Sequence, residues 1–228
     1  LPFVGRALHC DFIKVAAQAL FGARSELARF TPPADPLSLP YTAVKAPMFS
    51  FRRFRGADPL LGVEMVSTGE AGGFGETLSE ALAKALIATG FRFPQRGVLL
   101  SLGPTPHKYL FTEEARALVH RGLRLYATQG TAAVLGGEGI LCTPIDKGEA
   151  GAASEVLSRL RSGDIDLVIN LPRSFDTEGR PDGYRIRRAA IDLEIPLVTD
   201  LPLARAVVSM LISVKREDLK ALPHHAYR

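Results

Sequence analysis

The sequence predicts an α/β fold, a parallel sheet flanked by helices, preceded by an α+β segment. From residue 97 onward, short apolar runs without polar alternation take turns with segments of helical periodicity, which is typical of a parallel sheet covered on both faces. Before it, residues 31–40 (TPPADPLSLP) carry four prolines and indicate a connector. With 228 residues, 46% hydrophobic and 23% charged, the chain can bury a substantial core.

The N-terminal segment contains two predicted helices around an irregular middle. Residues 11–22 have apolar positions at helical spacing. Residues 41–75 are expected to be irregular, with strand-like pieces such as YTAVKAPMFSF and a glycine-rich stretch. Thr77 opens the second helix, where Glu80 completes a capping box and Gly90 gives the stop. We therefore divide the chain into residues 1–93, residues 94–214 and a tail, residues 215–228.

Strands and helices alternate along the second part. The apolar runs predict strands at residues 97–102, 123–127, 140–144, 166–171 and 196–199. The periodic segments predict helices at residues 112–121, 131–135, 152–162, 184–193 and 203–213. Each strand is thus followed by a helix, as a parallel sheet requires.

The charge of the chain indicates the kind of ligand, and its cysteines indicate the kind of compartment. The net charge of +4 and the pI of about 9.2, without a dense basic block, favour a small anionic ligand over nucleic acid. No apolar run approaches the roughly 20 residues that span a bilayer, so no membrane partner is expected. Cys10 and Cys142 lie in apolar contexts, which fits a reducing compartment, cytoplasmic or alternatively mitochondrial. The chain begins at Leu1 without a signal pattern and looks like a piece cut from something longer.

Polar side chains gather where the predicted strands end. Ligands of open α/β sheets bind beyond the carboxyl ends of the strands, where the order of the strands reverses. A helix N-terminus and lysine side chains at such an edge favour a phosphate or carboxylate. The strand ends and the loops after them predict an anion pocket formed by Lys108, Thr128, Gly130, Thr131, Lys147 and Asn170.

Each of these residues also has an ordinary structural explanation. Thr131 could only cap its helix, and Thr128 could be a plain strand terminus. A lone lysine is usually solvated, and Asn170 could be a turn former. The convergence of these residues at one sheet edge favours the binding hypothesis over these alternatives.

Other motifs predict no chemistry. The stretch GEAGGFGET follows no clear strand, so it is neither a Walker A loop nor a Rossmann fingerprint, and its glycines indicate a tight crossing of the backbone. No catalytic Ser-His-Asp or Cys-His set stands at the strand ends, and no metal-ligand set is found. Within the helix at residues 184–193, one or two of the arginines can face the pocket. The histidines lack metal-ligand company and are expected at the surface: His107, His120, His224 and His225.

Six stretches of the chain match a known family: LPFVGRALHCDFIKVAAQALFG, KAPMFSFRRFRGADPLLGVEMVSTGEAGGFGE, LYATQGTA, DLVINLP, YRIRRAAID and IPLVTD. Through them nearly the whole chain resembles the C-terminal part of the carbamoyl-phosphate synthetase large chain. Residues 1 to about 90 are similar to the end of the second ATP-grasp unit. Residues from about 95 onward are similar to the methylglyoxal-synthase-like regulatory domain.

The resemblance implies a regulatory part of a ligase. That family makes carbamoyl phosphate from bicarbonate and ammonia with two ATP and magnesium or manganese. The ammonia usually comes from glutamine through an amidotransferase subunit or domain. This fragment is then expected to hold no cofactor and to be non-catalytic, with the rest of the large chain, the amidotransferase and a small anionic effector as partners. Oligomer formation stays open.

The resemblance also assigns the effector pocket. The phosphate-binding lysine and the T-x-x-T hydroxyl pair of the family fall on Lys108, Thr128 and Thr131, with Gly130 inside the pair. A second lysine falls on Lys147, and the asparagine of DLVIN falls on Asn170. Arg173, which stands where N-acetylglutamate-activated enzymes have an asparagine, joins the set.

Several alternatives remain open at this stage. The ammonia-using, N-acetylglutamate-activated type carries tryptophan at the position of Lys147, and a lysine there suits a nucleotide phosphate such as that of UMP. Ornithine control is not expected, since Ala46 stands where that type has a glutamate. An active methylglyoxal-synthase-like lyase would need Asp146 or Glu149 as a general base. A domain that has lost its ligand and serves oligomer contacts is the last alternative.

Overall fold

The computed structural model describes residues 2–22, 35, 38–60, 67–146, 155–172 and 183–227. Two α-helices begin this part of the chain, α1 (Pro2–Ala7) and α2 (Phe12–Phe21), and α4 (Leu78–Ala88) follows an antiparallel hairpin. The strands are β1 (Thr42–Met48), β2 (Gly69–Gly75), β3 (Gly97–Leu102), β4 (Arg124–Thr128), β5 (Thr143–Ile145), β6 (Leu167–Leu171) and β7 (Leu197–Val198). The later helices are α5 (Thr105–Leu110), α6 (Thr112–His120), α7 (Gln129–Gly137), α8 (Glu155–Ser162), α9 (Tyr184–Asp192) and α10 (Leu201–Ser213). Short 3-10 turns are η2 (Phe51–Arg53), η3 (Arg216–Asp218) and η4 (His224–Ala226).

The predicted parallel sheet is confirmed. Its strand order is β5-β4-β3-β6-β7, and every neighbouring pair is parallel. From β3 the chain first builds outward through β4 and β5, and it then returns to place β6 on the other side of β3. The order of the strands therefore reverses between β3 and β6, which is where open α/β sheets bind ligands.

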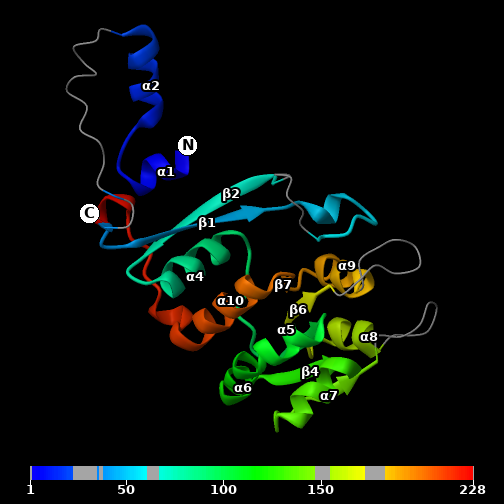
Figure 1. Cartoon of the computed structure of the whole chain (residues 1–228). Helices are drawn as coiled ribbons and strands as arrows, with labels where there is room; N and C mark the ends of the chain where they lie inside the picture. The colour runs from blue at the N-terminus through cyan, green and yellow to red at the C-terminus, as the bar shows by residue number, and fades with distance from the viewer. Residues whose placement is uncertain are drawn as a thin grey trace.

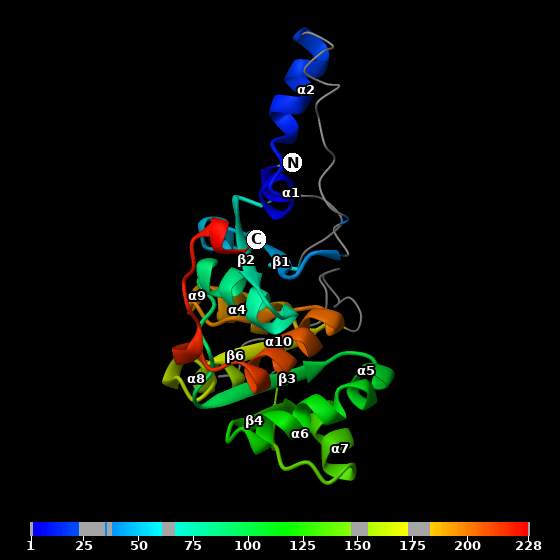
Figure 2. The same ribbon diagram turned by 90° about the vertical axis from the view of Figure 1, so that its left-hand side faces the viewer.

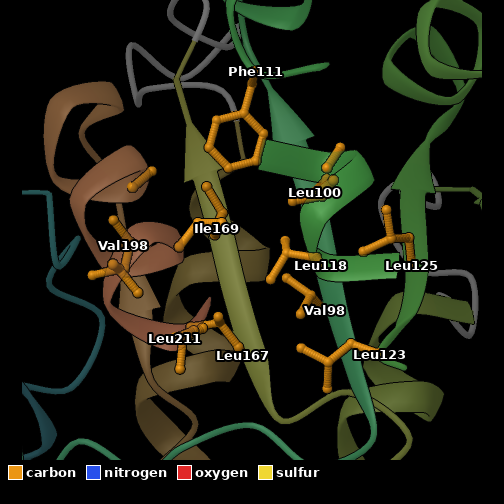
Figure 3. Close-up of a cluster of buried hydrophobic side chains, with 14 of the residues drawn as sticks. Val98, Leu100, Phe111, Leu118, Leu123, Leu125, Leu167, Ile169, Val198 and Leu211 are labelled. Atoms are coloured by element: carbon orange, nitrogen blue, oxygen red, sulfur yellow. The ribbon is translucent and has the colours of Figure 1, made fainter. Parts of the chain in front are cut away.

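Helices cover both faces of this sheet. On one face, side chains such as Val98, Leu100 and Ile169 pack against α4, α6 and α10 (Figure 3). On the other face, Leu99 and Val168 pack against α8 and α9. Successive strand residues thus point to opposite, equally apolar faces, which explains why the strands lack polar alternation in the sequence.

The glycine-rich stretch differs from the expectation. Residues 69–75 were expected to be irregular, yet they form β2, paired antiparallel with β1 from Thr42 opposite Gly75 to Met48 opposite Gly69. A Cβ atom on Gly73 would lie 2.1 Å from the Ala81 carbonyl oxygen of α4. The predicted tight crossing is therefore confirmed, because only glycine lets this strand lie directly on the helix backbone.

Two further boundaries differ from the sequence expectation. Residues 105–110 form α5, which the sequence did not predict, and its first turn contains Pro106, a residue that ordinarily marks a loop. Strand β5 spans only residues 143–145, whereas the sequence predicted a strand at residues 140–144.

At the start of α4 the predicted Thr77 cap is confirmed, but the Glu80 carboxylate binds the amide of Glu76 and not that of Thr77, which a capping box would require. The Thr77 hydroxyl accepts a hydrogen bond from the Glu80 amide at 3.2 Å, and the Glu80 carboxylate accepts one from the Glu76 amide at 2.9 Å. Lys84 donates to the same carboxylate at 2.5 Å. The hydrogen bond from Lys84 lowers the pKa of Glu80, although partial burial acts in the opposite sense.

This lowered pKa predicts an acid-sensitive contribution to stability. The contribution of ionised Glu80 is present above the unfolded-state pKa of about 4.5 and is lost as the pH falls through the lower folded-state pKa. Glu80→Gln should therefore destabilise the protein by about 1 kcal/mol or less at pH 6, and this difference should shrink below pH 4.5. Urea unfolding from pH 6 to pH 3 measures it. Glu113→Gln is the control, because Glu113 is exposed and its carboxylate is 3.7 Å from Arg116, which is too far for a hydrogen bond. Equal pH profiles for both variants would contradict the prediction.

Helices α1 and α2 lie apart from the five-stranded sheet, and the C-terminal residues of the chain lie close to α1 (Figures 1 and 2). In both views α2 projects away from the body, and the C-terminus lies beside the hairpin β1–β2 (Figures 1 and 2). Within the described segments, no helix has the length and apolar character needed to cross a membrane.

Candidate anion-binding site

Two buried threonines lie at the switch point of the sheet. Thr128 is the last residue of β4, and Thr131 lies in the first turn of α7. Their hydroxyl oxygens are 3.3 Å apart, and both side chains are buried. The Thr131 hydroxyl also accepts a hydrogen bond of 3.1 Å from the Leu102 amide at the end of β3. The alternative that Thr131 only caps its helix is therefore wrong, because this side chain joins two strands.

A lysine lies over the glycine between these threonines. Lys108 belongs to α5, the helix that follows β3, and its Nζ atom would lie 3.2 Å from a Cβ atom on Gly130. Gly130 therefore lets a cationic group come close to the backbone at the start of α7. Since a helix N-terminus carries a partial positive charge, both features favour an anion at this place.

Asn170 completes the part of the site that the structure describes. It lies in β6, opposite Ser101 of β3, and is fully buried, so the alternative that it forms a turn is wrong. Its side-chain oxygen accepts a hydrogen bond of 2.6 Å from Arg187 of α9. Its Nδ2 group is buried and has no hydrogen-bond partner among the described residues. An amide donor held in this way is ready for an acceptor atom of a ligand.

Arg187, one of the three arginines of α9, is the residue that fixes Asn170. It is fully buried, and it donates two hydrogen bonds to the carboxylate of Asp58, from Nε at 2.8 Å and from Nη2 at 2.5 Å. The sequence predicted that one or two arginines of this helix face the pocket, and the third, Arg185, is exposed. Asp58 was not among the predicted site residues, since it comes from the N-terminal part of the chain.

Further bonds attach the segment around Asp58 to α9. Arg188 donates to the carbonyl oxygens of Phe51, Phe54 and Ala57 at 3.2–3.3 Å. The Tyr184 hydroxyl donates to the Gly56 carbonyl oxygen at 2.7 Å. Tyr184, Arg187 and Arg188, which lie within little more than one turn of α9, thus hold residues 51–58 against the helix that orients Asn170.

Some predicted residues lie outside the described part of the chain. Lys147 and Arg173 are among them, and so is Glu149, the alternative general base. Asp146, the last described residue after β5, is exposed. The structure therefore brings together Lys108, Thr128, Gly130, Thr131 and Asn170, and these five remain the described core of the predicted pocket.

The remaining sequence candidates do not form a second centre. In the described segments, no group of three or more His, Cys, Asp or Glu side chains could hold a metal ion. A cleft of 540 Å³ between α6 and α10 is lined by Glu114, Arg205 and apolar neighbours, and none of these is a predicted site residue. Cys142 is partly buried, which raises the pKa of its thiol and keeps it protonated at neutral pH.

Comparisons with known proteins agree with the fold. Residues 111–199 match the family described as MGS-like domain. Multifunctional protein pyr1-3 of Dictyostelium discoideum is 39% identical over 220 residues, covering 94% of this chain and 10% of that protein. The mitochondrial carbamoyl-phosphate synthase [ammonia] of Homo sapiens is 37% identical over 230 residues, covering 98% of this chain and 15% of that protein.

A third relative belongs to the same group. Multifunctional protein URA2 of Saccharomyces cerevisiae is 38% identical over 221 residues, covering 92% of this chain and 10% of that protein. The chain therefore spans only 10–15% of the length of these relatives. They include both multifunctional proteins and an ammonia-type enzyme, so they leave the type of effector open. The resemblance seen in the sequence is confirmed: the chain belongs to the carbamoyl-phosphate synthase large-chain family, as a C-terminal region that contains its MGS-like domain.

Proposed function

We propose that this chain is the effector-binding regulatory part of a carbamoyl-phosphate synthase and that its ligand is a phosphorylated nucleotide such as UMP. The observation that supports this best is the set of donors at one sheet edge. The buried hydroxyls of Thr128 and Thr131, the Lys108 ammonium near Gly130 and the buried Asn170 amide all lie at the carboxyl ends of β3, β4 and β6. Hydroxyl, ammonium and amide donors gathered at one place suit a phosphate group.

The contacts of Asn170 support a regulatory role. Through Arg187, the pocket is joined to Asp58, a residue of the N-terminal part that resembles the end of an ATP-grasp unit. A ligand that binds the Asn170 amide acts on the same side chain that this buried ion pair orients. Allosteric control is a coupling of free energy between two sites, and a chain of hydrogen-bonded side chains of this kind can carry it.

The whole parent enzyme would supply the chemistry. It would use two ATP with magnesium or manganese to join bicarbonate and ammonia, with the rest of the large chain and a glutamine amidotransferase as partners. The ATP and metal sites would lie in the rest of the parent chain. A cytoplasmic location fits pyrimidine-type control, and a mitochondrial location would fit the ammonia type.

Calorimetric titration of the 228-residue chain with UMP, IMP, phosphoribosyl pyrophosphate and N-acetylglutamate tests the proposal. A phosphorylated ligand should bind, and Lys147→Ala should weaken its binding by about tenfold or more, because a charge-assisted hydrogen bond contributes about 1.5–3 kcal/mol. Lys220→Ala, an exposed lysine of the tail, is the matched control for the lost charge. Binding of N-acetylglutamate alone would overturn the nucleotide proposal and favour the ammonia type. Formation of methylglyoxal from dihydroxyacetone phosphate would favour the lyase alternative.

A further inference from the structure

The C-terminal tail crosses from the sheet domain to the N-terminal hairpin. After α10, Val214 and Leu219 still pack against the core of the sheet domain. The other described side chains of the tail, as far as residue 226, are exposed. Leu222, for example, is 49% exposed. The tail then reaches the hairpin β1–β2, beside which the C-terminus lies in both views (Figures 1 and 2).

Tyr227 anchors the end of this tail in an aromatic cluster of the N-terminal part. Its ring centroid is 6.0 Å from that of Tyr41, which precedes β1, and 5.7 Å from that of Phe74 in β2. Tyr41 is itself buried, and its hydroxyl donates to the Ala7 carbonyl oxygen of α1 at 2.5 Å. The ring of Tyr227 therefore completes a small core that joins α1, β1 and β2.

The polar groups of Tyr227 are bound as well. Its hydroxyl oxygen accepts a hydrogen bond of 2.7 Å from Lys84 of α4, and its carbonyl oxygen accepts one of 2.9 Å from His9. The Lys84 Nζ atom is 5.3 Å from the ring centroid, so it lies beyond the hydroxyl end of the ring and its contact is the hydrogen bond. Ring, hydroxyl and backbone of one residue thus contact β2, α4 and the turn after α1, which distinguishes Tyr227 from the exposed tail before it.

The hairpin lies on α4 through Gly73, and it is held in addition at both of its ends. At one end, Tyr227 packs on Tyr41 and Phe74. At the other end, the segment that follows β1 is bound by Arg187 and Arg188 of α9. A strand of seven residues separates the two attachments by about 20 Å.

We propose that residues 214–227 form a strap, with Tyr227 as its latch, that clamps the N-terminal hairpin to the sheet domain. The latch keeps the hairpin rigid between its two attachments. In consequence, a change at the α9 attachment reaches the Tyr41 end of the hairpin; this part of the proposal rests on the proposed function. The latch does not touch the anion-binding site, so it affects transmission and leaves ligand affinity unchanged.

Hydrogen–deuterium exchange of the 228-residue chain tests the strap. Tyr227→Ala should speed amide exchange in α1, β1 and β2 by about tenfold or more, and should leave β3, β4 and β6 unchanged. Tyr227→Phe keeps the ring contacts and loses the Lys84 bond, so its effect should be intermediate. Leu222→Ala, on the same tail but without these contacts, should exchange like the wild type. Wild-type exchange rates in β1 and β2 of Tyr227→Ala would overturn the proposal.

A second arm adds UMP as the probe. In the wild type, UMP should change the exchange rates at the Tyr41 end of the hairpin. In Tyr227→Ala, UMP should bind within about twofold of the wild-type affinity, while the change at that end is lost. A change that persists in Tyr227→Ala would overturn the transmission step. A wild-type chain that binds none of the titrated ligands would overturn the proposed function, and the strap would then be judged by the first arm alone.

Discussion

Asp58→Ala should destabilise the protein by about 3–5 kcal/mol, because it leaves the guanidinium of Arg187 buried without its carboxylate. Arg187 is fully buried and bonded to Asp58 through two nitrogens, so the variant leaves a buried positive charge without this counter-charge. Thermal unfolding should shift down by about 10 °C for a chain of this size. The affinity for a phosphorylated ligand should fall as well, since Arg187 orients the Asn170 amide.

A matched control and a double variant separate this effect from a general loss of charge. Asp192→Ala removes an exposed carboxylate that pairs with Arg188 on the same helix, and it should cost less than about 1 kcal/mol. Asp58→Leu combined with Arg187→Met removes both charges and should recover part of the stability lost in Asp58→Ala. If Asp58→Ala unfolds at the wild-type denaturant concentration, the buried pair contributes no stability and the prediction is wrong.

Thr131→Val should weaken binding of a phosphorylated ligand by about tenfold or more and should destabilise the chain by about 1–3 kcal/mol. Valine keeps the shape of the side chain, but it removes the hydroxyl that accepts from the Leu102 amide and lies beside Thr128. Both the ligand and the buried amide of β3 lose a partner. Calorimetric titration with UMP and urea unfolding measure the two effects.

Thr131→Ser is the matched control, because it keeps the hydroxyl and removes only a methyl group. It should retain most of the affinity and lose less stability than the valine variant. Equal affinities for the serine and valine variants would show that the hydroxyl takes no part in binding. A loss of stability without any loss of affinity would assign Thr131 a structural role only.

The alternation of apolar runs and periodic segments was enough to predict the sheet domain. It worked because strands buried on both faces must be apolar throughout, as Leu99 and Leu100 are on opposite faces of β3. The same reasoning failed at residues 69–75, since glycine has a low strand propensity and has no side chain to show a period. Those residues form a strand because Gly73 allows α4 to pack directly on the backbone.

The site was predictable in part for a similar reason. Parallel strands place their carboxyl ends at one edge of the sheet. The sequence alone therefore sufficed to place Thr128 and Asn170 at the same edge. The orientation of Asn170 could not be predicted, because it depends on Arg187 and on Asp58, which is 129 positions away from Arg187 in the chain. An aspartate before a proline in an irregular segment carries no signal that it is the partner of a buried arginine.

The sequence by itself determined the α/β class, the edge at which the predicted binding residues meet and the family, because local periodicity and strand direction act over a few residues at a time. Only the tertiary structure decided how the two parts are joined. The Asp58–Arg187 pair at one end of the hairpin and the Tyr227 latch at the other link residues far apart in the chain. Such contacts form where folding brings two distant residues together and removes water from them. The local sequence pattern around one residue does not predict which distant residue will be its partner.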